Sequence, residues 1–263
     1  MISVKETHQP SSGSPLTADR ARSASLEELR NVLVSAPLRY LEGAVDNPEL
    51  TPDEMALLLR NRAASAGLLA RLSRDRSWTR HYDVKKGLVR HPHTPFPAAR
   101  NLVGHLYWRD LADTIDDARI QPALRRQAEL VLADRVKEMS LGEQISVARR
   151  ATGMVIAELC RSGEGRVLQA LLGNPRLKEI DAVSVASGEE VPGEVLGWLA
   201  RHPKWGSQRS IRMALVRNAR TPVSEALKLV AKLPLDDVER LSDDDDVPRI
   251  VRVGADRRLE ARD

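Results

Sequence analysis

Histidine is the residue type in this sequence whose spacing comes nearest to that of a metal site. Four histidines lie within 25 positions, namely His81, His91, His93 and His105. The segment His91-Pro92-His93 could present two imidazoles to zinc or nickel if further ligands converged on them. His91 also occupies a position that asparagine holds in similar segments, where one helix ends and another begins, and this explains it without a metal. We therefore expect no metal site and no bound cofactor.

The most basic stretch of the chain lies between residues 71 and 90 and could bind phosphate groups. Phosphates attract clustered cations, and aromatic rings can stack on bases or sugars, so this stretch is the best candidate for a nucleic-acid contact. A solvated edge of a helical protein has a similar composition, so both interpretations stay open. We call the candidate partner-binding residues the basic strip: Arg71, Arg74, Arg76, Trp78, Arg80, Lys85, Lys86 and Arg90.

No catalytic pattern is recognisable in the sequence. Gly163-Glu164-Gly165 and Ser187-Gly188-Glu189-Glu190 lack the strand-then-helix context of a phosphate-binding loop, and we interpret both as turns. HEAT-like DNA glycosylases show that a solenoid can carry chemistry on scattered residues, which here would require buried carboxylates beside Trp78 or Trp108. We expect that the protein is not an enzyme.

Composition favours an all-α fold. Hydrophobic residues make up 42% of the 263 residues but aromatic residues only 3%, so the interior must consist mainly of Leu, Ala and Val. The two-residue alternation of β-proteins is not sustained anywhere in the chain. Cys160 is the single cysteine, which excludes an intramolecular disulfide, and no apolar run approaches the roughly 20 residues of a membrane span. With no signal-peptide pattern in the first 25 residues, we expect a cytoplasmic location.

One short pattern recurs three times after runs of small and aliphatic residues. It consists of Asn47-Pro48-Glu49-Leu50-Thr51-Pro52, His91-Pro92-His93-Thr94-Pro95 and Asn218-Ala219-Arg220-Thr221-Pro222. We expect Asn or His to end a helix in the left-handed conformation, Thr to cap the next helix through its hydroxyl, and Pro to be the first helical residue. Residues 47 and 91 are 44 positions apart, as are 174 and 218, a length typical of two-helix HEAT and armadillo repeats.

Local signals place the helices between these corners. Ser25 and Glu28 have the form of a capping box, as do Ser140 and Glu143, and the second box should open one long helix over residues 141–161. Residues 1–24 are rich in Ser, Pro, Thr and charge and are predicted to be a disordered tail. Residues 25–263 are predicted to form a single α-helical repeat domain. Further helices are expected near 165–173, 192–201, 207–217, 222–232 and 248–259.

The corner segments at 47–52, 174–177 and 218–222, each followed by a Leu-rich helix, resemble bacterial leucine-rich repeat variants and their HEAT-like relatives. The resemblance covers roughly residues 38–258. It implies an all-α, right-handed α-solenoid of stacked helical hairpins, with short 3₁₀ turns in the variant repeats. Some members carry a cysteine-ligated iron–sulfur cluster, which this chain cannot hold with Cys160 alone.

The sequence thus predicts a non-catalytic scaffold or adaptor that binds another macromolecule through a concave, Arg-rich solenoid face. A protein partner is favoured, because stacked repeats form extended binding surfaces and arginine pairs well with carboxylates. The alternative is a HEAT-like nucleic-acid-binding protein that uses the basic strip. The net charge of +4 is compatible with either partner.

Overall fold

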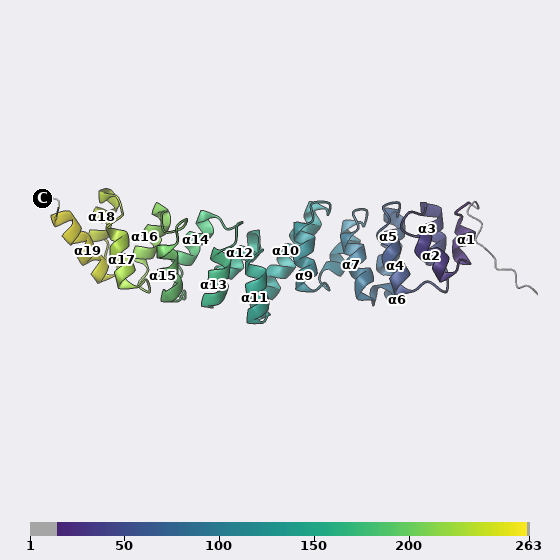
Figure 1. The fold of residues 1–263 in the computed structure, drawn as a ribbon, viewed down its shortest axis with the longest axis horizontal. Helices are drawn as coiled ribbons and strands as arrows, with labels where there is room; N and C mark the ends of the chain where they lie inside the picture. Colours follow the sequence, from purple (N-terminus) through teal and green to yellow (C-terminus); the bar gives the residue numbers. More distant parts are fainter. Residues whose placement is uncertain (1–14, 262–263) are drawn as a thin grey trace, which may run out of the picture. The chain divides into compact units, whose positions relative to one another are not determined.

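The fold consists of short α-helices joined by tight turns. The structure, a computed structural model, describes residues 15–261, and over this range it contains no β-strand. Within this range no helix is both long enough and apolar enough to cross a lipid bilayer. The chain divides into two compact units, Met1–Ala128 and Glu129–Asp263, with the boundary inside α10 (Pro122–Arg135). Each unit is an α-solenoid in which neighbouring helices pack against one another (Figure 1).

The first unit stacks its helices in two rows. In one row α2 contacts α4, α4 contacts α7, and α7 contacts α9; in the other row α1 contacts α3, and α5 contacts α8. The helices of this unit are α1 (Ala18–Arg22), α2 (Leu26–Val32), α3 (Leu38–Val45), α4 (Pro52–Leu58), α5 (Ala66–Arg74), α6 (Arg76–Thr79), α7 (Tyr82–Arg90), α8 (Phe96–Val103) and α9 (Trp108–Asp116).

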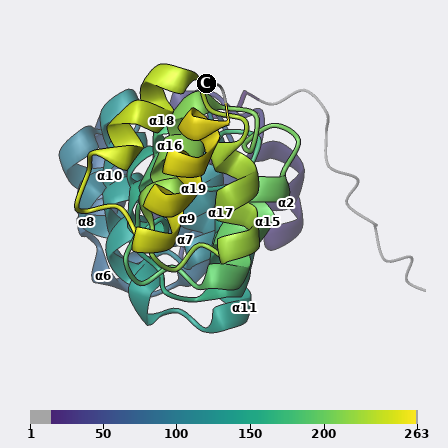
Figure 2. The ribbon, with the colours of Figure 1, turned by 90° about the vertical axis from the view of Figure 1, so that its left-hand side faces the viewer.

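The second unit repeats this arrangement. Successive contacts connect α11, α13, α15, α17 and α19 in one row, and α14 contacts α16 in the other; Figure 2 shows α15, α17 and α19 side by side. After the 3₁₀ helix η1 (Val136–Glu138), its helices are α11 (Leu141–Ala148), α12 (Gly153–Leu159), α13 (Gly165–Leu172), α14 (Glu179–Ala186), α15 (Gly193–Arg201), α16 (Arg209–Arg217), α17 (Val223–Val230), α18 (Leu235–Ser242) and α19 (Arg249–Glu260).

The interior confirms the composition argument. Buried positions are mainly Leu, Ala and Val, and Tyr40 and Trp205 are the buried aromatic residues of the described chain. Most helices bury an apolar stripe against neighbouring helices, which is how a solenoid forms a core without a globular centre. The helices expected from residue 165 onward are present as α13, α15, α16, α17 and α19, whereas α14 and α18 were not predicted.

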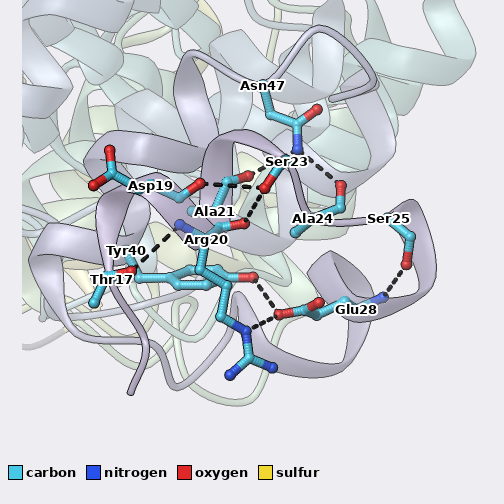
Figure 3. Close-up of polar contacts among 10 residues, drawn as sticks. All are labelled: Thr17, Asp19, Arg20, Ala21, Ser23, Ala24, Ser25, Glu28, Tyr40 and Asn47. Atoms are coloured by element: carbon cyan, nitrogen blue, oxygen red, sulfur yellow. Dashed lines mark hydrogen bonds and ion pairs between the residues drawn. The ribbon is translucent and has the colours of Figure 1, made fainter. Parts of the chain in front are cut away.

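Asparagine side chains connect four corners of the solenoid to an earlier part of the stack. The Asn47 Nδ2 amide donates to the carbonyl oxygens of Ala21 at 2.8 Å and Ala24 at 2.9 Å (Figure 3). Asn47 Oδ1 accepts a hydrogen bond from the Glu49 N–H at 2.8 Å. The same pattern is formed by Asn61, Asn174 and Asn218. Because these bonds satisfy main-chain carbonyl groups between turns of the solenoid, they explain why asparagine recurs at the corners.

The left-handed corner predicted from the sequence is wrong. No residue other than glycine has a positive φ in the described range, and the caps His91 (φ −76°, ψ 125°) and Asn218 (φ −80°, ψ 116°) are extended. The physical reason is that the corner side chain itself satisfies main-chain groups, so the backbone does not need a left-handed turn to do so.

The predicted Thr-Pro cap is correct in position at one of the three corners. Thr51 is the N-cap of α4 and Pro52 its first residue, but the Thr51 hydroxyl contacts the Glu54 carboxylate instead of accepting from a backbone N–H. At the other two corners Pro95 and Pro222 are themselves the N-cap residues, so each helix begins one residue later than predicted.

The single helix expected over residues 141–161 is in fact two helices, α11 and α12. The capping box at its start is confirmed, since Glu143 accepts from the Ser140 N–H at 3.1 Å. The break lies between Ala148 and Gly153, the first residue of α12, which has a φ of 37° and at which a Cβ would lie 2.5 Å from Glu129 Oε1. Glu129 accepts from the Met154 N–H at 3.2 Å and thereby fixes the start of α12, a tertiary contact that periodicity does not show.

Part of the segment predicted as a tail, residues 1–24, is helical. Residues 1–14 lie outside the described range, but residues 18–22 form α1, whose N-cap Thr17 accepts from the Arg20 N–H at 3.3 Å. Ala21 is buried, and α1 packs closely on α3 because Gly43 has no side chain: a Cβ there would lie 2.2 Å from the Ala18 carbonyl oxygen. The prediction of disorder is therefore wrong for residues 17–24, where packing on α3 and the Asn47 bonds order the chain.

Candidate functional site

The structure distributes the basic strip over α5, α6 and α7 and uses three of its cations in ion pairs. Arg71 Nη2 lies 2.8 Å from Asp46 Oδ1 and Lys86 Nζ lies 2.7 Å from Asp110 Oδ1. Arg90 Nη2 lies 3.8 Å from Asp117 Oδ2. These three side chains are therefore committed to carboxylates of the protein itself.

The other cations of the strip make no ion pair with a described residue. Arg74 and Arg76 are exposed on either side of Asp75, which caps α6, and Lys85 is half-buried on α7. Arg80 Nε donates to the His81 ring at 3.0 Å, and Trp78 is half-buried. The role of the basic strip in binding a partner remains a prediction.

Lys86 and Arg90, at the C-terminal end of the strip, line a cleft of about 640 Å³ in the first unit. We call it the cationic cleft. It is lined by residues of α4 and α7 and of the loops after α4, α7 and α9: Ala56, Leu59, Arg60, Arg62, Asp83, Lys86, Gly87, Arg90, His91, Pro92, Asp117 and Arg119. Its five lysine and arginine residues face only two carboxylates, so its formal charge is positive.

Asn61 fixes the loop that carries Arg60 and Arg62 on two sides. Its Nδ2 amide donates to the carbonyl oxygens of Leu33 at 2.8 Å and Ala36 at 2.9 Å. The main-chain carbonyl oxygen of Asn61 lies 3.0 Å from His91 Nε2. The flanking Arg60 and Arg62 side chains are exposed and form no ion pair with a described residue. A rigid backbone thus presents two free guanidinium groups, the arrangement that reduces the entropy cost of binding an anion.

His91 is a structural residue at the wall of the cleft. The Asn61 carbonyl can only accept, so His91 Nε2 must donate to it, and His91 Nδ1 accepts from the His93 N–H at 3.1 Å. Burial lowers the pKa of His91, although the Asn61 bond partly opposes this, so the ring is neutral. His93 Nδ1 lies 3.2 Å from the Ala64 carbonyl oxygen. These hydrogen bonds account for both histidines, and no group of three metal-ligating side chains occurs in residues 15–261.

Asp117 is paired within the cleft. Arg119 holds it with two bonds, Nε to Oδ1 at 2.9 Å and Nη2 to Oδ2 at 2.7 Å. These bonds hold the pKa of Asp117 well below its usual range, so Asp117 stays ionised and is a poor proton acceptor. The other lining carboxylate, Asp83, is exposed in the first turn of α7 and makes no ion pair within the described residues.

A buried network connects the cleft to an aromatic pair. Asp110 accepts from Lys86 and from the Tyr82 hydroxyl, and these bonds outweigh the effect of burial and lower the pKa of Asp110. Burial, followed by the bond to Asp110, raises the pKa of Tyr82 to about 12. Tyr82 therefore remains a neutral hydrogen-bond donor that holds Asp110 in place.

Sequence reasoning did not identify three of the arginines that line the cleft, of which Arg60 and Arg62 are unpaired and Arg119 is paired with Asp117. Arg60, Arg62 and Arg119 lie outside the basic strip, and Asn61 was not recognised as a corner because no proline follows it. One signal was available: arginine directly precedes the corner residue at Arg60-Asn61, Arg90-His91, Arg201-His202 and Arg217-Asn218. These arginines lie at or just after the end of a helix and therefore near the next helix of the row. An arginine repeated at this position indicates cations near the clefts between helices.

Comparison with known proteins yields no relative. No protein-family model matches the sequence, and neither a curated protein nor a solved structure is significantly similar to it.

Proposed function

We propose that this protein is a non-catalytic scaffold or adaptor that binds an acidic segment of another protein in the cationic cleft. The observation that carries the proposal is the pair Arg60 and Arg62, two unpaired guanidinium groups held on either side of the anchored Asn61. Guanidinium groups bind carboxylates through paired hydrogen bonds, so glutamate or aspartate side chains suit this site.

The chemistry of the cleft favours binding over catalysis. Both ring nitrogens of His91 are engaged with main-chain groups, and Asp117 is fixed by Arg119 with a lowered pKa. Neither group is poised to accept a proton from a substrate. A volume of about 640 Å³ accommodates a few side chains, which suits a peptide segment that enters the cleft from a larger partner.

The finer class of the repeat is also part of this proposal. We infer a HEAT-like solenoid, since α-helical hairpins account for both units and η1 is the one 3₁₀ helix in the described chain. A cytoplasmic location is a separate part of the proposal. A protein ligand and a HEAT-like repeat are compatible, because stacked helical hairpins characteristically present extended binding surfaces.

Nucleic acid is the alternative partner, and the unpaired Arg74 and Arg76 favour it. These exposed residues could contact phosphates, and binding of that kind weakens steeply and linearly in log salt. Phosphate contacts by the basic strip would not depend on Arg60 or Arg62. The two hypotheses therefore predict different effects of substitutions at Arg60 and Arg62 and at Arg74 and Arg76.

The test measures binding of a fluorescein-labelled hexaglutamate peptide and of a labelled single-stranded oligonucleotide by anisotropy at several salt concentrations. We expect Arg60→Gln/Arg62→Gln to weaken peptide binding at least about tenfold, since each charged hydrogen bond contributes roughly 1.5–3 kcal/mol. The matched control is Arg249→Gln/Arg257→Gln, which removes two exposed, unpaired charges from α19 and should have no specific effect.

Two outcomes would contradict the proposal. One is peptide binding that both double variants weaken equally, which would mean that net charge and not the cleft attracts the peptide. The other is tight, salt-sensitive oligonucleotide binding that Arg74→Gln/Arg76→Gln abolishes while hexaglutamate does not bind, which would establish the nucleic-acid alternative.

A further inference from the structure

The first unit carries an exposed aromatic pair beside the cationic cleft. Tyr107 is 66% exposed, and its ring lies on that of Tyr82 with the ring centroids 4.3 Å apart and an angle of 32° between the planes. Most large apolar side chains of this protein are buried, so an outward-facing ring stacked on a second ring is unusual here. Exposed aromatic residues of this kind often serve as anchors for a partner.

Hydrogen bonds hold this pair in place. The Tyr82 hydroxyl donates to Asp110 and accepts from the Tyr107 N–H at 3.0 Å. Tyr107 is the N-cap of α9, so its backbone is fixed by the helix as well as by Tyr82. A partner ring placed on Tyr107 would meet a pre-ordered surface and lose little additional side-chain entropy in the protein.

The pair lies along the same face of α7 as the cleft. Tyr82, Lys86 and Arg90 follow one another at intervals of one helical turn, and the last two line the cleft. Eight residues at a rise of about 1.5 Å place Tyr82 roughly 12 Å from Arg90 along the helix axis. An extended peptide covers about 3.3 Å per residue, so about four residues span this distance.

We infer that the acidic segment bound in the cleft carries an aromatic residue about four positions from its carboxylates, and that this ring stacks on Tyr107. This inference rests on the proposed function. Asp83, which is exposed at the cleft and directly follows Tyr82 in α7, favours a peptide over a nucleic acid, because a continuous phosphate backbone would pass a like charge whereas a peptide can place uncharged residues there.

The experiment is a double-mutant cycle with labelled peptides. Each peptide contains two glutamates and one ring position, separated by zero, three or eight Gly/Ser residues, in both chain directions, with Trp or Ala at the ring position. We expect Trp with a spacer of three residues to bind about threefold to tenfold more tightly than Ala, the size of a stacking contact, and Tyr107→Ala to abolish that advantage. Ile180→Ala, which truncates a residue that is 70% exposed in the second unit, is the matched control.

The outcomes separate this inference from the proposed function. If the Glu–Glu peptides bind in a manner that depends on Arg60 and Arg62 but Trp adds nothing at any spacing, the aromatic contact is refuted and the acidic-segment proposal stands. A Trp advantage that persists in Tyr107→Ala, or that is equal at all spacings, would refute the stacking position. If no acidic peptide binds, the proposed function itself fails.

Discussion

The cationic cleft of the first unit has a counterpart in the second unit. The two clefts differ in where the carboxylate on the next helix of the row is placed. The second cleft, of about 400 Å³, lies beside α15 and α17 and is lined by Arg201, Arg212, Lys228 and Lys232, with Glu225 as its acidic residue. Both clefts thus combine an arginine that precedes a corner residue with a carboxylate in the first turn of the next helix of the row.

The second cleft pairs two of its four cations with its own carboxylate. Glu225 lies 3.1 Å from Arg201 Nη1 and 3.3 Å from Lys228 Nζ, and its carboxylate is largely buried. Arg212 donates to the main-chain carbonyls of Gly206 and Lys232. In the first cleft the corresponding pair, Arg60 and Asp83, is exposed and forms no ion pair with a described residue. The two clefts are lined by similar residues but differ in whether their arginines are free to bind an anion. The placement of one carboxylate decides this.

The largest effect is expected from Asn61→Ala, which tests whether anchoring of the loop matters. The change leaves the Leu33 and Ala36 carbonyls without their amide partner, so we expect the free energy of unfolding to fall by about 2–4 kcal/mol. Urea unfolding measures this. Asn174→Ala removes the same two kinds of bond in the second unit and should destabilise similarly, but only Asn61→Ala should weaken hexaglutamate binding. Equal loss of binding in both variants would refute a local role for Asn61.

A pH effect of intermediate size is expected from His91. Its pKa is lower in the folded protein than the ordinary value of 6.5, because burial and the nearby His93 and Arg62 disfavour the charged ring. Below that value the unfolded chain binds more protons than the folded chain. The free energy of unfolding should therefore be independent of this group above about pH 6.5 and fall as the pH is lowered, by at most about 1.4 kcal/mol per pH unit.

Urea unfolding between pH 5 and pH 8 measures this slope. His91→Asn provides the control, since asparagine occupies the same corner position elsewhere and does not titrate. The difference between the two slopes isolates His91, because the half-buried His202 is present in both proteins. Parallel curves for the two proteins would show that His91 does not contribute.

The smallest effect on stability is expected from Glu225→Gln, which tests whether this carboxylate keeps an anion out of the second cleft. Its partners Arg201 and Lys228 have side chains that are more than half exposed, so the loss of these ion pairs should cost about 1 kcal/mol or less. The freed Arg201 and Lys228 should then bind an acidic peptide, which raises the calorimetric stoichiometry of hexaglutamate from one to two. Glu164→Gln, which removes the surface pair with Arg166, is the control. An unchanged stoichiometry would mean that the carboxylate does not block the second cleft.

Prediction from the sequence succeeded where one residue or one short pattern controls the structure. Ser140 and Glu143 were correctly paired, and the Leu-, Ala- and Val-rich core follows from composition. It failed where a distant residue intervenes. Glu129 divides the predicted helix 141–161 in two, and α3 orders residues that composition assigns to a tail.

The sequence predicted only the part of the cationic cleft that α7 contributes. Lys86 and Arg90 belong to the predicted strip, but charge clustering along the sequence could not indicate that their partners in the cleft are Arg60, Arg62 and Arg119. The helices that carry these groups lie in neighbouring turns of the solenoid, and adjacency in a stack depends on packing rather than on sequence distance.

The helical class, the composition of the core and the recurrence of Asn and Arg at the corners can be read from the sequence, because they depend on local propensity and on periodic apolar surface. Which arginines are unpaired depends on how the helices pack. An ion pair forms when packing brings a carboxylate of one turn within about 4 Å of a cation of another, as at Glu225, and leaves the cation open to solvent when it does not, as at Arg60.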